Sequence, residues 1–235
     1  MSAPHLFASS VAEDEVVIED DDAHHAVRVL RLRPGERVTI SDGEGNVADA
    51  TVVRAGGQLV ARVEARRHVR REPPALTVLQ GIPKAGKLDV VVQKLTELGV
   101  DELIPLQAGR SVARWDDPRK QERLAVIARE AAKQSRRAWL PVVRPPVRPA
   151  TALTEGLTLV LHEEAGLRLR DALPPRAPDR ITLVVGPEGG LDAEEVEMFV
   201  KNGGQAVSLG PTILRTETAA LVAATLILGR YGRLG

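Results

Sequence analysis

Residues 183–228 constrain the fold of this chain more than any other stretch. Two β-branched runs, residues 181–185 and 206–209, have the length and composition of buried strands. Each run leads directly into a loop of glycine and proline, residues 186–190 after the first and 210–212 after the second. The expected order is therefore strand, loop, helix, strand, loop, helix.

The helix between the two loops has clear ends. Asp192 is placed to cap its first turn, Glu195 follows three residues later as in a capping box, and the Asn-Gly-Gly of residues 202–204 ends it. The next helix, residues 219–228, is apolar on every side, which predicts burial in a core or an interface. We expect a homodimer, because one small α/β domain covers only part of such a helix.

The two glycine loops predict one binding pocket, because ligands of open α/β sheets bind where loops leave the carboxyl ends of strands. Glycine at such positions lets a ligand approach the main chain. The first loop lacks the Lys-Ser/Thr ending of a P-loop, and no dinucleotide glycine fingerprint follows a strand. Ordinary tight turns are the alternative, but they do not explain the polar residues 215–218 beside an apolar helix.

At these motifs the sequence resembles a known family. The segments VVGPEGG, residues 184–190, and SLGPTILRTETA, residues 208–219, are similar to those of the bacterial 16S rRNA uridine-N3 methyltransferases, the RsmE-like family of the SPOUT superfamily. The resemblance implies an α/β fold with a parallel sheet and a deep trefoil knot, preceded by a small PUA-like β-barrel. It also implies methylation of N3 of a uridine in the 16S rRNA of the small ribosomal subunit.

The resemblance implies S-adenosylmethionine as the methyl donor, enclosed by three loops. One loop follows the expected strand at residues 157–162, and the other two are the glycine loops. The residues expected to bind the cofactor are Leu161, His162, Gly186, Pro187, Glu188, Gly189, Gly190, Leu209, Gly210, Ile213 and Leu214.

Arg215 is the first candidate catalytic residue. A fixed guanidinium can stabilise the anion that uridine becomes when N3 loses its proton. Glu217 either acts as the base or orients Arg215, and the residue types do not decide between these roles. A buried salt bridge of Arg215 with Glu217 or Glu188 is the structural alternative.

Residues 1–72 are expected to form the small β-barrel domain. Short strands are expected at residues 15–18, 37–41, 48–54 and 59–64, separated by glycine-containing turns.

The basic run at residues 66–71, followed by Glu72 and two prolines, is interpreted as a linker, because such a run neither packs well nor continues a strand. The second domain is expected to comprise residues 73–235. It opens with a strand at residues 76–80, an amphipathic helix that ends at Gly99, and a strand at residues 100–106. This β-α-β alternation predicts a parallel sheet with helices on both faces.

RNA-binding residues are expected first in the segment HHAVRVLRLR, residues 24–33. A helix there would have Val27, Leu30 and Leu32 on its apolar side and arginines outside. The family resemblance covers this segment too and implies RNA contacts. The residues concerned are His24, Arg28 and Arg31.

A second RNA-binding region is expected in residues 110–148, which hold 11 basic and 4 acidic residues. A helix is expected over residues 118–138, with Leu124, Ile127, Ala131 and Ala138 as its buried stripe. Its residues 130, 134 and 137 are spaced four and three apart and would share one face. The candidate RNA-binding residues here are Arg110, Arg114, Glu130, Gln134 and Arg137. Because the chain has one Tyr, two Phe and two Trp, stacking of bases on an aromatic platform is not expected.

The amino-acid composition excludes several classes of protein and of active-site chemistry. The formal net charge of zero argues against a generally basic nucleic-acid binder, and the absence of cysteine excludes disulfides and thiolate chemistry. No signal peptide or membrane span is evident, so a cytoplasmic location is expected. The acids after His162 suggest a metal site, but too few ligands stand nearby, so no metal is expected. The alternative functions are ribose 2′-O methylation of tRNA or rRNA, and RNA binding without catalysis.

Overall fold

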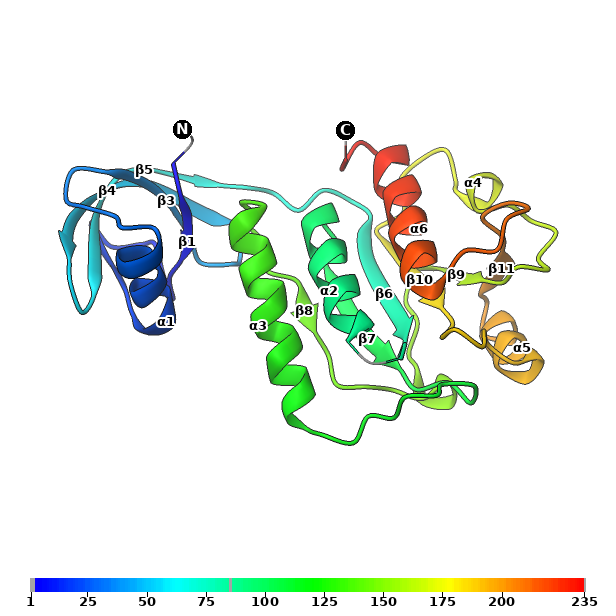
Figure 1. The fold of residues 1–235 in the computed structure, drawn as a ribbon. Coiled ribbons are helices and arrows are strands. Elements are labelled where there is room, and N and C mark those ends of the chain that lie inside the picture. Colours follow the sequence, from blue (N-terminus) through cyan, green and yellow to red (C-terminus); the bar gives the residue numbers. More distant parts are fainter. Residues whose placement is uncertain (1–2, 85, 235) are drawn as a thin grey trace. The chain divides into compact units, whose positions relative to one another are not determined.

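The computed structural model describes residues 3–84 and 86–234, which divide into two compact units (Figure 1). The first unit runs to Arg71 and also includes Ala132–Leu140. The second unit comprises Glu72–Ala131 and the chain from Pro141 onward. The division into a domain of residues 1–72 and a domain of residues 73–235 remains a prediction.

A five-stranded sheet forms the first unit, with strand order β1-β3-β4-β5-β2. All pairs are antiparallel except β1 with β3, and the sequence pattern did not indicate β1. Alternating residues such as Val16 and Ile18 face the core and are buried. The strands are β1 (His5–Phe7), β2 (Glu15–Ile18), β3 (Arg37–Ser41), β4 (Asn46–Ala55) and β5 (Leu59–His68).

The basic run after Glu64 continues a strand, so the linker interpretation is wrong as far as His68. β4 is ten residues long and offers main-chain partners to β5 at both of its ends, pairing Asn46 with His68 and Ala55 with Leu59. Asp49 accepts a hydrogen bond from Arg67 at 2.8 Å, which also neutralises part of the run. Pairing with β4, together with this ion pair, accounts for strand structure in a sequence that has no apolar alternation.

The segment expected to be one helix over residues 24–33 is shorter and irregular. α1 (Asp20–His24) passes into a π-helical turn, His25–Val29, and the chain reverses at Arg31, where φ is 56°. Leu32 is buried as expected, but Leu30 is 41% exposed, so its place on an apolar side was wrong. Helical spacing does not hold beyond Val29, because the chain changes direction there.

α3 (Arg119–Gln134) ends four residues earlier than expected. A turn follows in which Arg136 has a φ of 57°, and residues up to Leu140 pack within the first unit. Lys133 Nζ lies 2.6 Å from a carboxylate oxygen of Asp22, and both side chains are buried. The end of the helix is thus determined by contacts that are distant in sequence.

The second unit contains a six-stranded sheet with order β11-β9-β10-β6-β7-β8, and every pairing is parallel. The predicted α/β fold with a parallel sheet is therefore confirmed, whereas the trefoil knot remains a prediction. The strands are β6 (Ala75–Gly81), β7 (Glu102–Leu106), β8 (Val142–Val143), β9 (Leu157–Leu161), β10 (Arg180–Val185) and β11 (Gln205–Val207).

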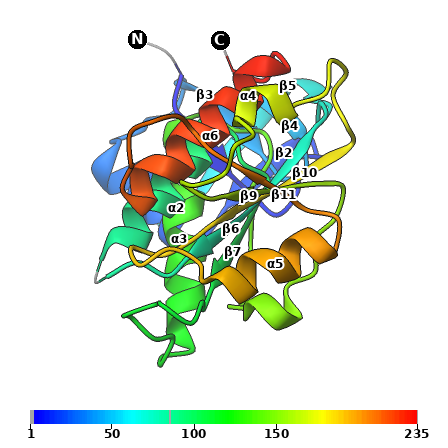
Figure 2. The same ribbon diagram turned by 90° about the vertical axis from the view of Figure 1, so that its right-hand side faces the viewer.

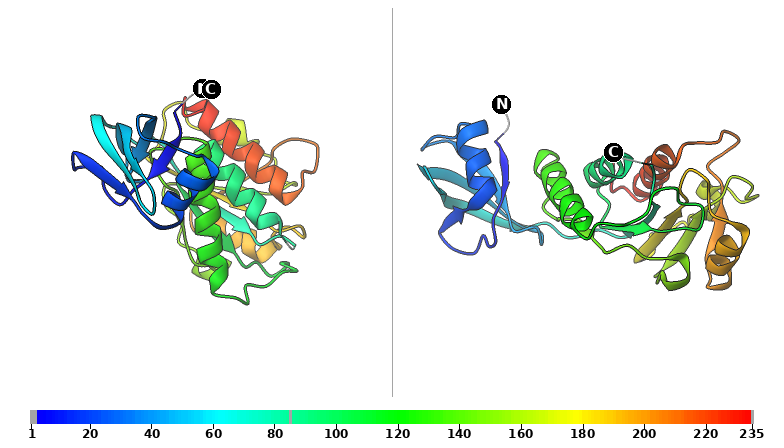
Figure 3. Two further views of the ribbon diagram at one scale, coloured as in Figure 1. Left: turned by 60° about the vertical axis from the view of Figure 1, so that its left-hand side comes forward. Right: turned by 60° about the horizontal axis from the view of Figure 1, so that its bottom comes forward.

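Helices cover both faces of this sheet (Figures 2 and 3). Alternate residues of one strand face opposite cores, so Val78 packs under α2 and α6 while Leu79 packs toward α5. α5 has the predicted capping box of Asp192 and Glu195 at its start, and Gly99 caps α2 in the left-handed region. The helices are α2 (Lys87–Leu98), α4 (Leu169–Ala172), α5 (Ala193–Lys201) and α6 (Thr216–Arg230), with a 3₁₀ turn at Pro149–Thr151.

In the part of the chain that the structure describes, no helix combines the length and apolar character needed to cross a membrane.

Candidate active site

A cavity of about 360 Å³ opens at the carboxyl ends of β9, β10 and β11. The parallel strands bring their following loops to the same edge, so residues far apart in sequence meet there. Every residue predicted to bind the cofactor lines this cavity, from Leu161 and His162 through both glycine loops to Leu214. Much of the wall is main chain, and Ile213 at the rim is 80% exposed.

The first glycine loop packs directly on the end of β6. A Cβ added at Gly81 would lie 2.2 Å from the nitrogen of Pro187 and 2.4 Å from the carbonyl carbon of Gly186. No residue other than glycine fits here, because the two backbones are too close to leave room for a Cβ atom. The loop is also tight in itself, because a Cβ at Gly186 would lie 2.9 Å from main-chain atoms of Gly190 and Leu191.

A buried hydrogen-bond chain holds the carbonyl group of Gly186. The Thr216 hydroxyl donates to Gly186 O at 2.5 Å and accepts from the side-chain amide of Gln80 at 2.9 Å. The same amide nitrogen donates to Gly81 O at 3.0 Å. Gln80 is 2% exposed, so β6, the glycine loop and the start of α6 are connected without solvent.

Lys87 at the start of α2 joins two acids of the site. Its ammonium lies 3.0 Å from a carboxylate oxygen of Glu217 and 3.8 Å from one of Glu188. Glu188 also accepts a hydrogen bond from the main chain of Lys84 at 2.9 Å. A hydrogen bond from its own backbone amide lowers the pKa of Glu217, and Lys87 adds to this lowering while burial opposes it. Glu217 is therefore held ionised, which makes it a weak proton acceptor.

Arg215 lines the cavity as the N-cap residue of α6. Its side chain is exposed, and among the described residues it forms no ion pair with Glu217 or Glu188. The proposed structural salt bridge is therefore not formed, and Lys87 is the cation that these acids contact. Glu217 itself is not part of the cavity wall.

The candidate RNA-binding residues lie in different parts of the chain. His24, Arg28 and Arg31 are exposed in the first unit, and Arg110 and Arg114 belong to the loop after β7.

The face predicted for residues 130, 134 and 137 is not formed, because only the first two lie within α3. Glu130 and Gln134 are exposed on that helix, whereas Arg137 lies beyond its end and is half-buried. The carbonyl oxygen of Arg137 is 3.1 Å from Nε2 of His5.

His162 and Glu163 line the cavity, but they do not form a metal cluster. In the described ranges, 3–84 and 86–234, no three His, Asp or Glu side chains converge in a way that could hold a metal ion.

Three residues that brace the site were not predicted from the sequence. Thr216 lies in the cavity wall, Gln80 and Lys87 lie outside it, and none of the three had an expected role in the site. The signal for Gln80 was present, since a polar residue at the end of an otherwise buried strand requires a partner. Its partner could not be found without the fold, because Thr216 is 136 residues away.

Comparisons with known proteins agree with this architecture. Two family models match the chain, an RNA methyltransferase PUA domain over residues 18–64 and an RNA methyltransferase domain over residues 70–228. The PUA-like domain predicted at the N-terminus is thereby confirmed.

The chain is 41% identical over 230 residues to Ribosomal RNA small subunit methyltransferase E of Mycobacterium bovis, covering 93% of this chain and 86% of that protein. It is 34% identical to the Bacillus subtilis protein of the same name, covering 89% and 88%. The crystal structure of a Ribosomal RNA small subunit methyltransferase E from Neisseria gonorrhoeae bound to S-adenosyl methionine aligns with a TM-score of 0.88 at 28% identity over 98% of each chain. By sequence and by structure, the chain belongs to the family of the ribosomal RNA small subunit methyltransferases E.

Proposed function

We propose that this chain transfers a methyl group from S-adenosylmethionine to N3 of a uridine in the 16S rRNA of the small ribosomal subunit, in the cytoplasm. The observation that supports this most directly is the cavity in which the predicted cofactor loops meet, with Arg215 in its wall. Relatives that share 41% and 34% of its residues carry the corresponding name.

The residues present fit S-adenosylmethionine. The cavity volume of about 360 Å³ falls within the range of about 300–1,000 Å³ that is typical of small-molecule sites. Leu161, Leu209 and Leu214 supply apolar surface for a base, and the glycine loops expose main-chain groups for polar contacts. When bound, the cofactor supplies a methyl group on a sulfonium, which is a good leaving group.

The chain's own task is to position uridine and stabilise its anion. The N3 proton must leave before or during attack, because the neutral imide engages the lone pair. Arg215 forms no ion pair with an acid of the described residues and borders the cavity, so it can face the negative charge that develops on the base. Glu217, held ionised by its own amide and Lys87, keeps the start of α6 in place.

Mass mapping of 16S rRNA tests the proposal. Unmodified small subunits incubated with the protein and cofactor should gain one methyl group on a uridine base. A nuclease-resistant dinucleotide would instead reveal ribose 2′-O methylation. Cofactor binding without any methylated product would instead support the alternative of an RNA-binding protein without catalysis.

We also propose that the chain acts as a homodimer and without a metal ion. α6 buries Ala223 and Ile227, but Leu226 is 45% exposed and Val222, four residues earlier on the same face, is only partly buried. Apolar side chains left partly open on this helix support pairing with a second copy. Sedimentation at micromolar concentration should show a dimer, and chelators should leave methylation unchanged.

A further inference from the structure

A second, larger cavity lies at the same edge of the sheet as the first. It has a volume of about 660 Å³ and opens at the carboxyl end of β7. The loop after β7, the segment around Arg148 and one side of α5 enclose it, with Trp115 and Met198 among its walls.

The walls of this cavity are held in place by hydrogen bonds within the protein. The side chain of Gln107 accepts a hydrogen bond from the Trp115 amide at 2.9 Å and donates to Ala113 O at 3.1 Å. The backbone N–H of Gln107 donates to Val147 O at 2.8 Å, which connects the loop to the opposite wall of the cavity. A site organised in advance loses less entropy when it binds.

The free charge in the cavity is positive. Arg114 and Arg148 are exposed in its wall, and neither guanidinium forms an ion pair with a described residue. The acid in the wall, Glu195, is buried and accepts hydrogen bonds from the amides of Gly109 at 2.7 Å and Asp192 at 3.0 Å.

The acids of the neighbouring loop are also paired. Asp116 binds Lys120, and Asp117 binds Arg119 at 3.3 Å. An anion entering the cavity would therefore meet two cations and no free carboxylate among the described residues that line it.

Trp115 and Met198 give the second cavity an aromatic and apolar surface. Trp115 is half-buried against the core and also lines the cavity, so part of its ring is accessible there. Nucleobases stack on aromatic side chains whatever their sequence, and methionine sulfur packs well against rings. Two free arginines beside such a surface suit a phosphate joined to a base.

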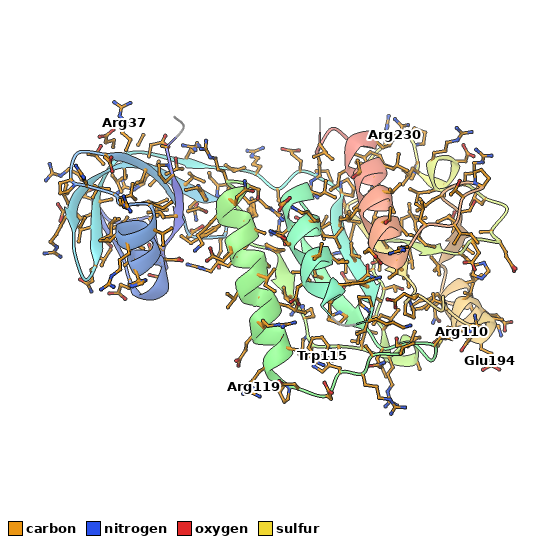
Figure 4. The ribbon with its side chains drawn as sticks, viewed as in Figure 1. Arg37, Arg110, Trp115, Arg119, Glu194 and Arg230 are labelled. Atoms are coloured by element: carbon orange, nitrogen blue, oxygen red, sulfur yellow. The ribbon has the colours of Figure 1, made fainter. Side chains whose placement is uncertain are left out.

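The loop that lines the second cavity contacts the glycine loop of the first, through Arg110, which stands between the lining residues Gly109 and Ser111. Arg110 donates a hydrogen bond to Gly189 O at 3.2 Å, and Gly189 lines the first cavity. Figure 4 shows Arg110 beside α5 and Trp115 further along the same loop, toward α3. The second cavity therefore lies next to the glycine loop that lines the first.

We propose that the second cavity binds a nucleotide of the RNA substrate next to the methylated uridine, with Arg114 and Arg148 at phosphate and Trp115 and Met198 at the base. This inference rests on the proposed function. It makes an exception to the expectation that aromatic stacking plays no part in RNA binding, because a single tryptophan suffices for one base.

The chain's two tryptophans allow a direct test, since Trp139 lies in the other unit. In a Trp139→Phe variant, Trp115 is the remaining reporter, and a short oligouridylate should quench its fluorescence. Replacing Arg114 and Arg148 with Ala should lower the slope of log affinity against log salt by about 0.7 for each phosphate that is no longer neutralised. Trp115→Ala should weaken oligouridylate binding about tenfold, whereas Trp115→Phe should retain most of it.

Arg170→Ala is the matched control, because Arg170 is an exposed arginine of the same unit outside both cavities. It should leave RNA affinity unchanged, and all variants should bind S-adenosylmethionine as the parent does. On small subunits, the Arg114 and Arg148 variants should raise KM more than they lower kcat.

The outcomes separate this inference from the proposed function. Normal methylation by the wild-type chain, with no quenching and unchanged affinity in the arginine variants, overturns the nucleotide site alone. Quenching and weaker RNA binding in the variants of a chain that methylates no small subunit would support the site and remove the proposed function.

Discussion

The Thr216 hydroxyl at the start of α6 donates a 2.5 Å hydrogen bond to the carbonyl oxygen of Gly186, 30 residues earlier in the chain. This bond joins the polar cluster to the glycine loop, two motifs that the sequence shows only as separate segments. It also means that the loop's shape depends on a side chain outside the loop.

Thr216→Val should therefore loosen the cofactor loop. Valine keeps the shape of threonine but removes the hydroxyl donor to Gly186 O and leaves the Gln80 amide with only its bond to Gly81 O, which should cost about 1–3 kcal/mol of stability. Calorimetry should show weaker binding of S-adenosylmethionine, and Thr216→Ser should restore it. Thr225→Val is the control on the same helix, since its hydroxyl bonds to Leu221 O at an exposed position. Equal cofactor affinity in the two valine variants would contradict the role given to Thr216.

Substitutions in the glycine loop should distinguish the effect of a steric clash from the effect of an unfavourable backbone φ. Gly186→Ala places a methyl group 2.9 Å from the loop's own backbone, so both melting temperature and cofactor affinity should fall. Gly190→Ala meets no atom within 4 Å, but its φ of 70° should cost on the order of 1 kcal/mol. Gly56→Ala, with open space and no such φ, should be neutral. Thermal unfolding and calorimetry on the three variants measure these effects. If Gly186→Ala lost no more stability and cofactor affinity than Gly56→Ala, the loop would be adaptable and the expectation wrong.

Arg215→Ala should act on the chemical step. Because Arg215 forms no ion pair with a described residue, its removal leaves no acid unpaired, and melting temperature and cofactor affinity should be unchanged. Single-turnover methylation should fall by about 10²–10³-fold, as for the loss of one preorganised donor. Arg230→Ala, at the other end of α6, should methylate normally. A lower melting temperature with normal turnover would assign Arg215 to structure.

His5 should make the stability of the first unit depend on pH. Burial lowers its pKa, so below about pH 6.5 the unfolded chain binds a proton that the folded chain does not. The stability contributed by neutral His5 is complete above that pH and is lost as the pH falls toward the lowered pKa. Urea unfolding between pH 5 and 8 should show a shallower pH dependence for His5→Gln than for the wild-type chain. The exposed His24→Gln should follow the wild-type curve, and identical curves for all three would exclude His5 as the cause.

Local signals in the sequence predicted the parts of the fold that local contacts determine. The cap and capping box of α5 involve residues three apart, and Gly99 ends α2 through its own backbone. The apolar runs that became β6 and β10 needed only to be buried. That the two glycine loops meet at one cavity could be predicted because parallel strands bring their loops to one edge, whichever side chains the loops carry.

Contacts distant in sequence determined the parts that were predicted wrongly or missed. α3 ends where Lys133 meets Asp22, 111 residues away, and β5 extends because β4 supplies partners to residues that lack strand character. Lys87 approaches Glu217 only after α2 and α6 have packed on the same face of the sheet. No period or spacing in the sequence records such pairs.

The contact of Gly81 with Pro187 also limits how the enzyme can be altered. Gly186 and Pro187 in the cavity wall are backed by the main chain of β6 at Gly81, so no choice of side chain at Gly81 can enlarge the cavity there. An engineer who wants this protein to accept a bulkier cofactor analogue must work at the mouth, where Ile213 is largely exposed. The same restriction predicts that natural variants will diversify at that mouth while the spacing between β6 and the loop stays constant.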